Sequence, residues 1–153
     1  MPIVRLFETF FYLTMSQPVL SKSSEDYLEA IGHLVRLHGA AQISDIAAFL
    51  KVKKPSVTSA VRLLAELKLV EYTQYAPVRL TAKGKKMADR IIFAHETLQK
   101  FLHDVAGLSL ERSDAAACLI EHVLTPDEID RIGRVTRCLE EHPCMKDALQ
   151  KED

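Results

Sequence analysis

The stretch ISDIAAFLKVKKPSVTSAVRLLAELK, residues 43–68, decides the fold. Ser44 followed by Asp45 is typical of a helix start, and Pro55 suits the first position of a second helix. In this second helix the apolar residues Val57 and Val61 recur at helical spacing. Only residues 51–54 separate the two segments, so the stretch predicts two short helices joined by a tight turn.

A helix before this stretch and a hairpin after it complete the pattern. Ser23 or Ser24 can cap a first helix that ends at Gly39. After the quoted stretch, residues 69–73 and 78–80 are typical of two strands joined by a short turn. Three helices followed by a two-stranded hairpin, the wing, predict a winged helix-turn-helix. The helix that begins at Pro55 would then be the recognition helix, which enters the major groove of DNA.

Small and basic side chains lie on the predicted recognition helix and the wing, where they suit contacts with base edges and phosphates. We expect DNA contacts at Lys53, Lys54, Pro55, Ser56, Thr58, Ser59, Arg62 and Arg79. A small helical domain with a solvated basic face is the alternative interpretation. The order of the elements, and the basic residues on both helix and wing, favour DNA binding.

The second half of the chain predicts a helical unit. Thr81 can cap a long helix that is broken at Gly107, a further helix covers about residues 110–124, and Thr125-Pro126 begins the last one. This last helix has an apolar seam that a single chain would leave exposed, so we expect a homodimer through it. The seam consists of Ile129, Ile132, Thr136 and Leu139, with Cys138 packed near it.

The sequence therefore predicts a mainly α-helical protein with a winged helix-turn-helix at its N-terminal end and a helical dimerisation domain after it. We expect the DNA-binding domain over residues 23–82, the second domain over 83–145 and a tail over 146–153. Residues 1–22 fit no element of this fold. They could be an amphipathic arm, or translation could start at Met15.

Composition narrows the function classes. The 153-residue chain has a net charge of −1, so its basic residues can favour phosphate only locally. Its three cysteines form no CxxC pattern, which argues against a disulfide framework and fits a reducing, cytoplasmic compartment. No stretch approaches the roughly 20 apolar residues of a membrane span, so we expect no membrane partner.

Residues that can bind metal recur in the second half of the chain. Cys118, Glu121 and His122 are spaced three and four residues apart, so a helix would place them on one face, with Asp114 one turn earlier. Thiolate, carboxylate and imidazole together suit Fe²⁺, Mn²⁺, Co²⁺ or Zn²⁺. A small buried cysteine beside a surface Glu-His pair is the ordinary structural alternative.

Two further groups could join them. Asp26 and Glu29 form a carboxylate pair on the first helix, although acids there commonly complement the helix dipole. His95 lies at the margin of the apolar stripe of the long helix, where a half-buried histidine with ordinary partners is the alternative.

Five motifs follow one another in order along residues 23–141. They are Ser24-Glu25-Asp26-Tyr27-Leu28-Glu29, Val57-Thr58 before an apolar recognition helix, Leu80-Thr81-Ala82-Lys83-Gly84, His95 followed by Leu98 and Phe101-Leu102, and Glu121-His122-Val123-Leu124. Together they resemble the metal-dependent repressors of the diphtheria toxin repressor and manganese transport regulator family, in the shorter form without an SH3-like domain.

The resemblance implies a metal pair that ties the first helix to the long helix and the helix after it. The implied ligands are Asp26, Glu29, His95, Cys118, Glu121 and His122. The manganese branch is similar at Asp26 and Glu29 but has Glu in place of Cys118, whereas the iron branch has Cys there and typically Met in place of Asp26. The resemblance implies a repressor that responds to Mn²⁺ or Fe²⁺, with Co²⁺ and Zn²⁺ able to bind in vitro, and that binds a palindromic operator as a homodimer.

Two other functions stay open at this point. A winged-helix regulator that senses no metal would not need His95, Cys118 and Asp26 to converge. A metallohydrolase could use Glu121 as a base beside His122, but the chain has no HExxH, GxSxG or P-loop motif. We therefore expect no enzyme and no catalytic residues.

Overall fold

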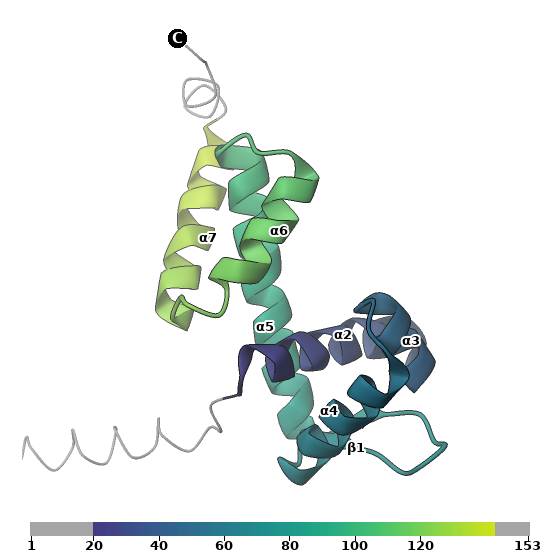
Figure 1. Cartoon of the computed structure of the whole chain (residues 1–153). Coiled ribbons are helices and arrows are strands. Elements are labelled where there is room, and N and C mark those ends of the chain that lie inside the picture. The colour runs from purple at the N-terminus through teal and green to yellow at the C-terminus, as the bar shows by residue number, and fades with distance from the viewer. Residues whose placement is uncertain (1–19, 143–153) are drawn as a thin grey trace, which may run out of the picture.

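The computed structural model describes residues 20–142, so all but residues 20–22 of the predicted N-terminal extension (1–22) and the whole predicted tail (146–153) lie outside the described residues. The elements are α2 (Lys22–His38), α3 (Ile43–Phe49), α4 (Lys54–Glu66), β1 (Val70–Glu71), β2 (Arg79–Leu80), α5 (Ala82–Lys100), η1 (Phe101–Val105), α6 (Leu110–Ile120) and α7 (Pro126–Glu141). Helix α5 runs through both halves of the molecule, with α2, α3 and α4 around one end and α6 and α7 around the other (Figure 1). Within residues 20–142, no helix is long and apolar enough to cross a membrane.

Side-chain caps explain where the helices begin. The Thr81 hydroxyl accepts a hydrogen bond from the Gly84 N–H at the start of α5, and Thr125 forms a capping box with Glu128 at the start of α7, as predicted. The prediction that Ser23 or Ser24 caps the first helix is wrong, because Ser21 caps α2. Likewise Gln42, not Ser44, precedes α3, and α4 begins one residue before Pro55.

The wing is shorter than predicted. Strand β1 pairs antiparallel with β2, with Val70 opposite Leu80 and Glu71 opposite Arg79. Val78 is held instead by Ala41, whose N–H donates to the Val78 carbonyl at 3.0 Å and whose carbonyl accepts from the Val78 N–H at 2.8 Å. The hairpin is therefore anchored to the chain segment between α2 and α3.

One apolar core holds the first unit together. Leu28 and Ile31 of α2, Ile46 of α3 and Val61 and Leu64 of α4 are fully buried. The first half of α5 joins this core at a close helix crossing. A Cβ atom at Gly32 would lie 2.9 Å from Ile92 Cδ1 and 3.0 Å from Ala88 Cβ, so a side chain there would force these neighbours on α5 to shift.

Helix α7 closes a second, smaller core, and this corrects the predicted dimer seam. Ile129, Thr136 and Leu139 are only 3%, 3% and 8% exposed within the single chain. Ile129 packs with Leu98 of α5 and Ala117 of α6, and Ile132 packs partly buried against the same cluster. The expectation that one chain would leave the seam exposed is therefore wrong, because α5 and η1 already cover it, with Ala117 of α6 against Ile129. Cys138 faces outward from α7 and not toward the seam.

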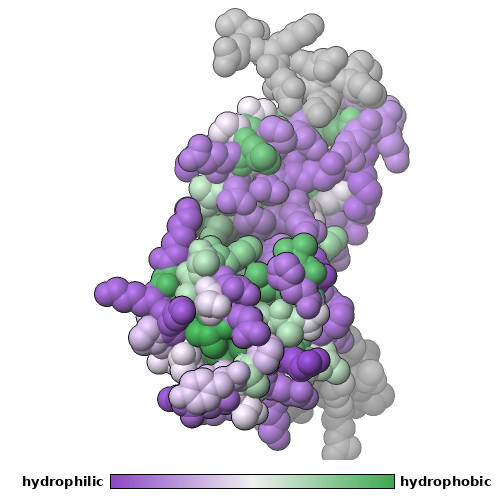
Figure 2. All heavy atoms as spheres, turned by 90° about the vertical axis from the view of Figure 1, so that its right-hand side faces the viewer, coloured by the Kyte–Doolittle hydropathy of each residue, from purple (hydrophilic) through white to green (hydrophobic). Residues whose placement is uncertain are grey.

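The long helix changes form before it ends. Beyond Lys100 it continues as the π-helical turn η1, in which the Ala106 N–H donates to the Phe101 carbonyl five residues earlier. Gly107, with a φ of +72°, then ends it as predicted. On one side of the molecule, apolar side chains gather over the lower unit while the upper unit is mainly hydrophilic (Figure 2).

Candidate metal centre and DNA-binding face

Three segments bring the predicted metal ligands together. Asp26 and Glu29 lie in the first turns of α2, His95 lies on α5, and Cys118 lies in the last turn of α6. Helix α6 ends at Ile120, four residues earlier than predicted. Glu121 caps it, with its N–H bonded to the Ala117 carbonyl at 2.9 Å, and His122 follows in the turn that leads to α7.

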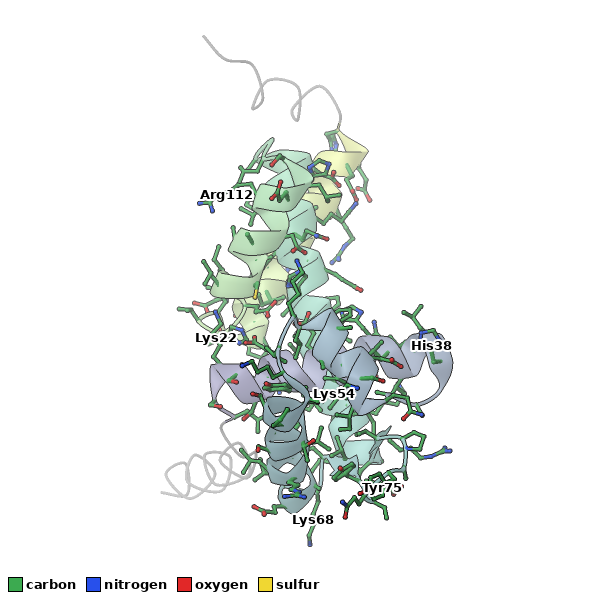
Figure 3. All side chains as sticks on the ribbon, turned by 45° about the vertical axis from the view of Figure 1, so that its right-hand side comes forward. Lys22, His38, Lys54, Lys68, Tyr75 and Arg112 are labelled. Carbon is green, nitrogen blue, oxygen red and sulfur yellow. The ribbon has the colours of Figure 1, made fainter. Side chains whose placement is uncertain are left out.

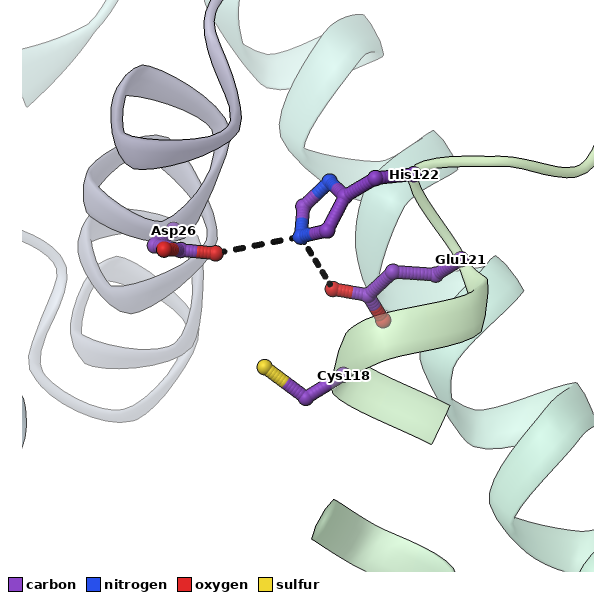
Figure 4. A group of neighbouring side chains, drawn as sticks. All are labelled: Asp26, Cys118, Glu121 and His122. Atoms are coloured by element: carbon purple, nitrogen blue, oxygen red, sulfur yellow. Dashed lines mark hydrogen bonds and ion pairs between the residues drawn. The ribbon is translucent and has the colours of Figure 1, made fainter. Parts of the chain in front are cut away.

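The first group of ligand atoms joins α2 to the end of α6. One ligand atom from each of Asp26, Cys118, Glu121 and His122 lies within 4.8 Å of the others. His122 Nε2 is 3.2 Å from Asp26 Oδ1 and 3.4 Å from Glu121 Oε1, while the Cys118 sulfur lies below them in the same cluster (Figure 4). Sulfur, nitrogen and oxygen donors thus converge on one point.

The second group shares Glu121 with the first. Ligand atoms of Glu29, His95 and Glu121 also lie within 4.8 Å of one another. His95 Nδ1 is 2.8 Å from Glu121 Oε2 and 3.8 Å from Glu29 Oε1. Since Oε1 of Glu121 faces the first group and Oε2 faces the second, this one carboxylate bridges two adjacent donor sets.

The burial of Glu121 fits a bound cation. Its side chain is 1% exposed, and its Oε1 atom is buried without a hydrogen-bond partner. Burying a neutral polar group without a partner destabilises the fold by roughly 1–3 kcal/mol, and burying a charged group destabilises it by more. A buried, unpartnered carboxylate oxygen therefore needs a compensating charge. The carboxylates of Asp26 and Glu29 are close by as well, and a single protonated imidazole at His95 does not offset these three carboxylates. The donors present therefore fit a divalent metal ion.

The surroundings also change how two ligand candidates titrate. The hydrogen bond with the Glu121 carboxylate raises the pKa of His95 to about 9, with Glu29 and Asp114 acting in the same direction against the effect of burial. Burial raises the pKa of the Cys118 thiol above its ordinary value, and the negative charges of Glu121 and Asp26 add to this. In the metal-free protein at neutral pH, both groups therefore hold their protons.

Two carboxylates beside the centre lie outside the predicted ligand set. Glu25 Oε2 is 2.5 Å from His122 Nδ1, and Asp114 Oδ1 is 3.1 Å from His95 Nε2. The spacing of Asp114 from Cys118 pointed to the same helix face. Nothing in the sequence separated Glu25 from a helix-start acid, since its contact crosses 97 positions of the chain.

The predicted DNA contacts lie together at the surface of the first unit. Lys53, Lys54, Pro55, Ser56, Ser59, Arg62 and Arg79 are exposed, and Thr58 is half-buried. Lys54 projects from the start of α4, with Lys68 beyond its end and Tyr75 on the wing loop of the same unit (Figure 3). The hydroxyls of Thr58 and Ser59 donate to carbonyls one turn earlier, at 3.1 Å each, so their acceptor lone pairs stay available.

Comparison with known proteins identifies both units. Residues 19–78 match the family model described as the N-terminal DNA binding domain of the iron dependent repressor, and residues 81–149 match its metal binding and dimerisation domain. The chain is 38% identical over 128 residues to the HTH-type transcriptional regulator MntR of Bacillus subtilis, which covers 84% of this chain and 89% of that protein. It is 40% identical over 111 residues to MntR of Oceanobacillus iheyensis, over 72% of this chain and 75% of that one.

Solved structures agree with this assignment. The crystal structure of T. acidophilum IdeR superposes with a TM-score of 0.63 at 36% identity, covering 71% of this chain and 51% of that one. The manganese regulator SloR, at 24% identity and a TM-score of 0.66, supports the fold, over 74% of this chain and 53% of that one. This chain thus spans about half the length of these two structures. The chain belongs to the iron-dependent repressor family, and it is a metal-dependent transcriptional repressor and not an enzyme.

Proposed function

We propose that this repressor senses Mn²⁺ or Fe²⁺ in the cytoplasm and, once loaded, binds a palindromic operator as a homodimer to control metal-ion homeostasis. The observation that carries the proposal is the convergence of donors from two units. Asp26 and Glu29 belong to the DNA-binding unit, whereas Cys118, Glu121 and His122 belong to the dimerisation unit. A regulator that senses no metal has no need for such a cluster around a buried carboxylate.

The proposed ligands are the six residues of the two groups. Asp26, Cys118 and His122 would hold one ion, Glu29 and His95 a second, and Glu121 both. A bound divalent ion supplies the positive charge that offsets these converging carboxylates. Asp26 and Glu29 are then drawn toward the end of α6, so the first turns of α2 become fixed to the dimerisation unit.

Fixing α2 has a consequence for DNA binding. Helix α2 packs against α3 and α4, so the orientation of the recognition helix α4 follows that of α2. If the two recognition helices of a dimer already sit in the correct orientation, less conformational entropy is lost on binding two half-sites. The half-sites would be separated by about one helical turn of DNA or a multiple of it.

The DNA contacts are proposed from exposure and charge. Lys53 and Lys54, with Arg62 and Arg79, would contact phosphates, and Pro55, Ser56, Thr58 and Ser59 would lie nearer the bases. Within residues 20–142, no carboxylate forms an ion pair with any of these four basic side chains. Their charge is therefore available to the DNA backbone.

The homodimer is proposed on a different surface from the buried seam. The dimerisation unit exposes several large apolar side chains that a partner would cover: Phe93, Leu110, Leu119, Val123 and Val135. Sedimentation velocity at micromolar concentration should show a dimer, and a stable monomer would contradict this part of the proposal.

The decisive experiment is an electrophoretic mobility shift on DNA, with and without metal. Wild-type protein should shift a palindromic operator fragment in the presence of Mn²⁺ or Fe²⁺ and lose the shift in excess chelator. Asp26→Asn and Glu121→Gln should need far more metal for the same shift. A shift that is equally strong in chelator would support the regulator that senses no metal.

A second arm of the experiment tests the recognition helix. Lys54→Ala should weaken binding to all DNA sequences alike and lower the salt dependence of log K by about one unit. Glu66→Ala on the same helix, at an exposed residue that forms no ion pair within residues 20–142, serves as the matched control. If Lys54→Ala changes neither affinity nor salt dependence, the proposed DNA face is wrong.

A further inference from the structure

The two ring nitrogens of His122 have different environments. Nε2 faces Asp26 and Glu121 inside the cluster, and the other ring nitrogen points away from it (Figure 4). That second nitrogen, Nδ1, lies 2.5 Å from Glu25 Oε2. The His122 side chain is 9% exposed and Glu25 is 29% exposed, so this contact is shielded from water on the imidazole side.

His95 shows the same arrangement with its nitrogens exchanged. Nδ1 faces Glu121 and Glu29, while Nε2 lies 3.1 Å from Asp114 Oδ1. The Gln99 amide also donates to Asp114 Oδ1, at 3.0 Å, and so holds this carboxylate in place. Each histidine therefore has one nitrogen toward the donor cluster and the other toward a carboxylate outside it.

We propose that Glu25 and Asp114 are positioning residues that fix opposite tautomers of the two histidines. Glu25 accepts the Nδ1–H of His122 and leaves Nε2 free as a ligand, and Asp114 accepts the Nε2–H of His95 and leaves Nδ1 free. This inference rests on the proposed function, in which both histidines are ligands. A carboxylate on the outer nitrogen fixes the ring orientation and makes the ligating nitrogen more basic.

Glu25 has a second consequence because of the element that carries it. It lies on α2 of the DNA-binding unit, whereas His122 follows α6 of the dimerisation unit. The hydrogen bond therefore joins the two units directly, beside the proposed metal bridge formed through Asp26. Glu25 and Asp26, neighbours in one turn of α2, thus contact the two ring nitrogens of His122: Glu25 at Nδ1 and Asp26 at Nε2.

The test uses Zn²⁺ alone, since a diamagnetic ion permits NMR and needs no DNA. In full-length protein labelled with ¹⁵N-histidine, the Zn²⁺-loaded wild type should show His122 bound through Nε2 with a protonated Nδ1, and His95 bound through Nδ1 with a protonated Nε2. Zn²⁺ affinity, measured against a chromophoric chelator, should fall by about 10- to 100-fold in Glu25→Ala and, less strongly, in Asp114→Ala. Asp114 is the more exposed of the two, which is why we expect the smaller loss there.

Conservative variants separate positioning from charge. Glu25→Gln and Asp114→Asn keep a carbonyl acceptor, so they should recover most of the affinity and the wild-type tautomers. Glu66→Ala removes a distant carboxylate and should change neither measurement. Circular dichroism checks that each variant is folded. If an Ala variant does not fold, the Zn²⁺ affinity and the tautomers are measured in the near-isosteric Gln and Asn variants instead.

Three outcomes would overturn the inference. The first is Zn²⁺ affinity within twofold of wild type in Glu25→Ala. The second is a loss in Glu25→Gln as large as in Glu25→Ala, which would mean that charge alone acts. The third is His122 bound through Nδ1. If the wild type binds none of Zn²⁺, Mn²⁺ and Fe²⁺, the proposed metal function falls together with the inference, whereas the other outcomes leave that function intact.

Discussion

Cys118 brings a sulfur atom into a group that otherwise offers carboxylate oxygens and an imidazole nitrogen. Thiolate favours Fe²⁺, Co²⁺ and Zn²⁺ over Mn²⁺, while Asp26 and Glu29 favour the harder Mn²⁺. We therefore expect a centre that accepts both Fe²⁺ and Mn²⁺, with Fe²⁺ somewhat favoured. The thiol has to lose its proton first, and its raised pKa makes this more costly than for an exposed cysteine.

Substitution of Cys118 should move the metal preference. In Cys118→Glu, activation of DNA binding by Fe²⁺ and Co²⁺ should weaken relative to activation by Mn²⁺, because a hard ligand replaces a soft one. Wild-type protein loaded with Co²⁺ should show a near-ultraviolet charge-transfer band from the thiolate, and Cys118→Ser should not. If the wild type lacks the band, or the Ser variant keeps it, Cys118 only fills space beside the centre.

Protonation of His95 predicts a pH dependence for metal binding. A ligating imidazole must be neutral, and the pKa of His95 in the metal-free protein is about 9. Below pH 9, each unit of pH decrease should therefore weaken binding by up to about tenfold for this one proton. Calorimetry at pH 7 in buffers of different ionisation enthalpy should show protons released from both His95 and Cys118. The Cys118→Ser variant should release fewer, and pH-independent affinity between pH 6 and 8 would contradict the prediction.

The same proton affects the stability of the metal-free fold. Because the folded pKa of His95 lies above its ordinary 6.5, protonated His95 stabilises the folded state. That contribution is complete below pH 6.5 and is lost as the pH rises through 9. Metal binding and metal-free stability therefore respond to pH in opposite directions at this residue.

At the scale of the elements, the first turn of α5 lies unusually close to the backbone of Leu69, directly before β1. A Cβ atom on Gly84 would lie 1.7 Å from the Leu69 carbonyl oxygen and 2.6 Å from its carbon, so backbone would have to move. Gly84→Ala should therefore destabilise the protein by about 3 kcal/mol or more, above the usual range for overpacking.

Gly133 provides the matched control for that prediction. Its Cβ would meet Thr97 Cγ2 at 3.4 Å, which is ordinary contact, and alanine is a better helix former than glycine by about 1 kcal/mol. Gly133→Ala on α7 should therefore be neutral or slightly stabilising. Urea denaturation measures both variants, and a Gly84→Ala protein as stable as wild type would mean that α5 does not approach the Leu69 backbone this closely.

Elements could be predicted where their determinants are local. The N-caps at Thr81 and Thr125 were correct because each cap bonds to the backbone three residues further on. The dimer seam failed because helical spacing shows that one face of α7 is apolar but not whether its own chain or a partner covers it. The end of α6 at Ile120 was also missed. The apolar pattern continues beyond Ile120 into the turn before α7, so the pattern alone does not show where the helix ends.

The candidate metal centre, too, could be predicted only where its determinants are local. Spacing within α6 placed Cys118 near Glu121, and the structure adds that Asp26 and His95 reach them from other helices. The distance between helices is not encoded in any local pattern, which is why Glu25 was not distinguished from its neighbour Asp26. Three results stay predictions: the set of six ligands, the residues of the DNA face and the domain boundaries. Helix α5 crosses the predicted boundary between residues 82 and 83 without a break.

At the scale of the whole molecule, α2 packs mainly against α5, and the proposed ligands of α2, Asp26 and Glu29, lie near the N-terminal end of that helix. The ion pair of Arg36 with Asp89, at 2.9 Å, joins the same two helices near the other end of α2. It is exposed and contributes at most about 1 kcal/mol. Metal binding should therefore add a restraint at the first turns of α2, where several carboxylates converge and only histidines oppose them in the metal-free protein.

This placement predicts where metal changes local stability. At 100 times its dissociation constant, a bound ion stabilises the folded state by about 2.7 kcal/mol. Amide hydrogen exchange should slow most in residues 22–29 of α2 and in residues 117–122, because the ligands restrain these segments directly. Exchange in β1 and β2, which hold no ligand, should change little. Asp26→Asn should weaken the slowing in α2, where Glu29 remains as a ligand, and leave His95 and Glu121 able to protect their own segments. Uniform slowing over both units would instead mean that metal stabilises the fold as a whole, and the recognition helices would then not be oriented through α2.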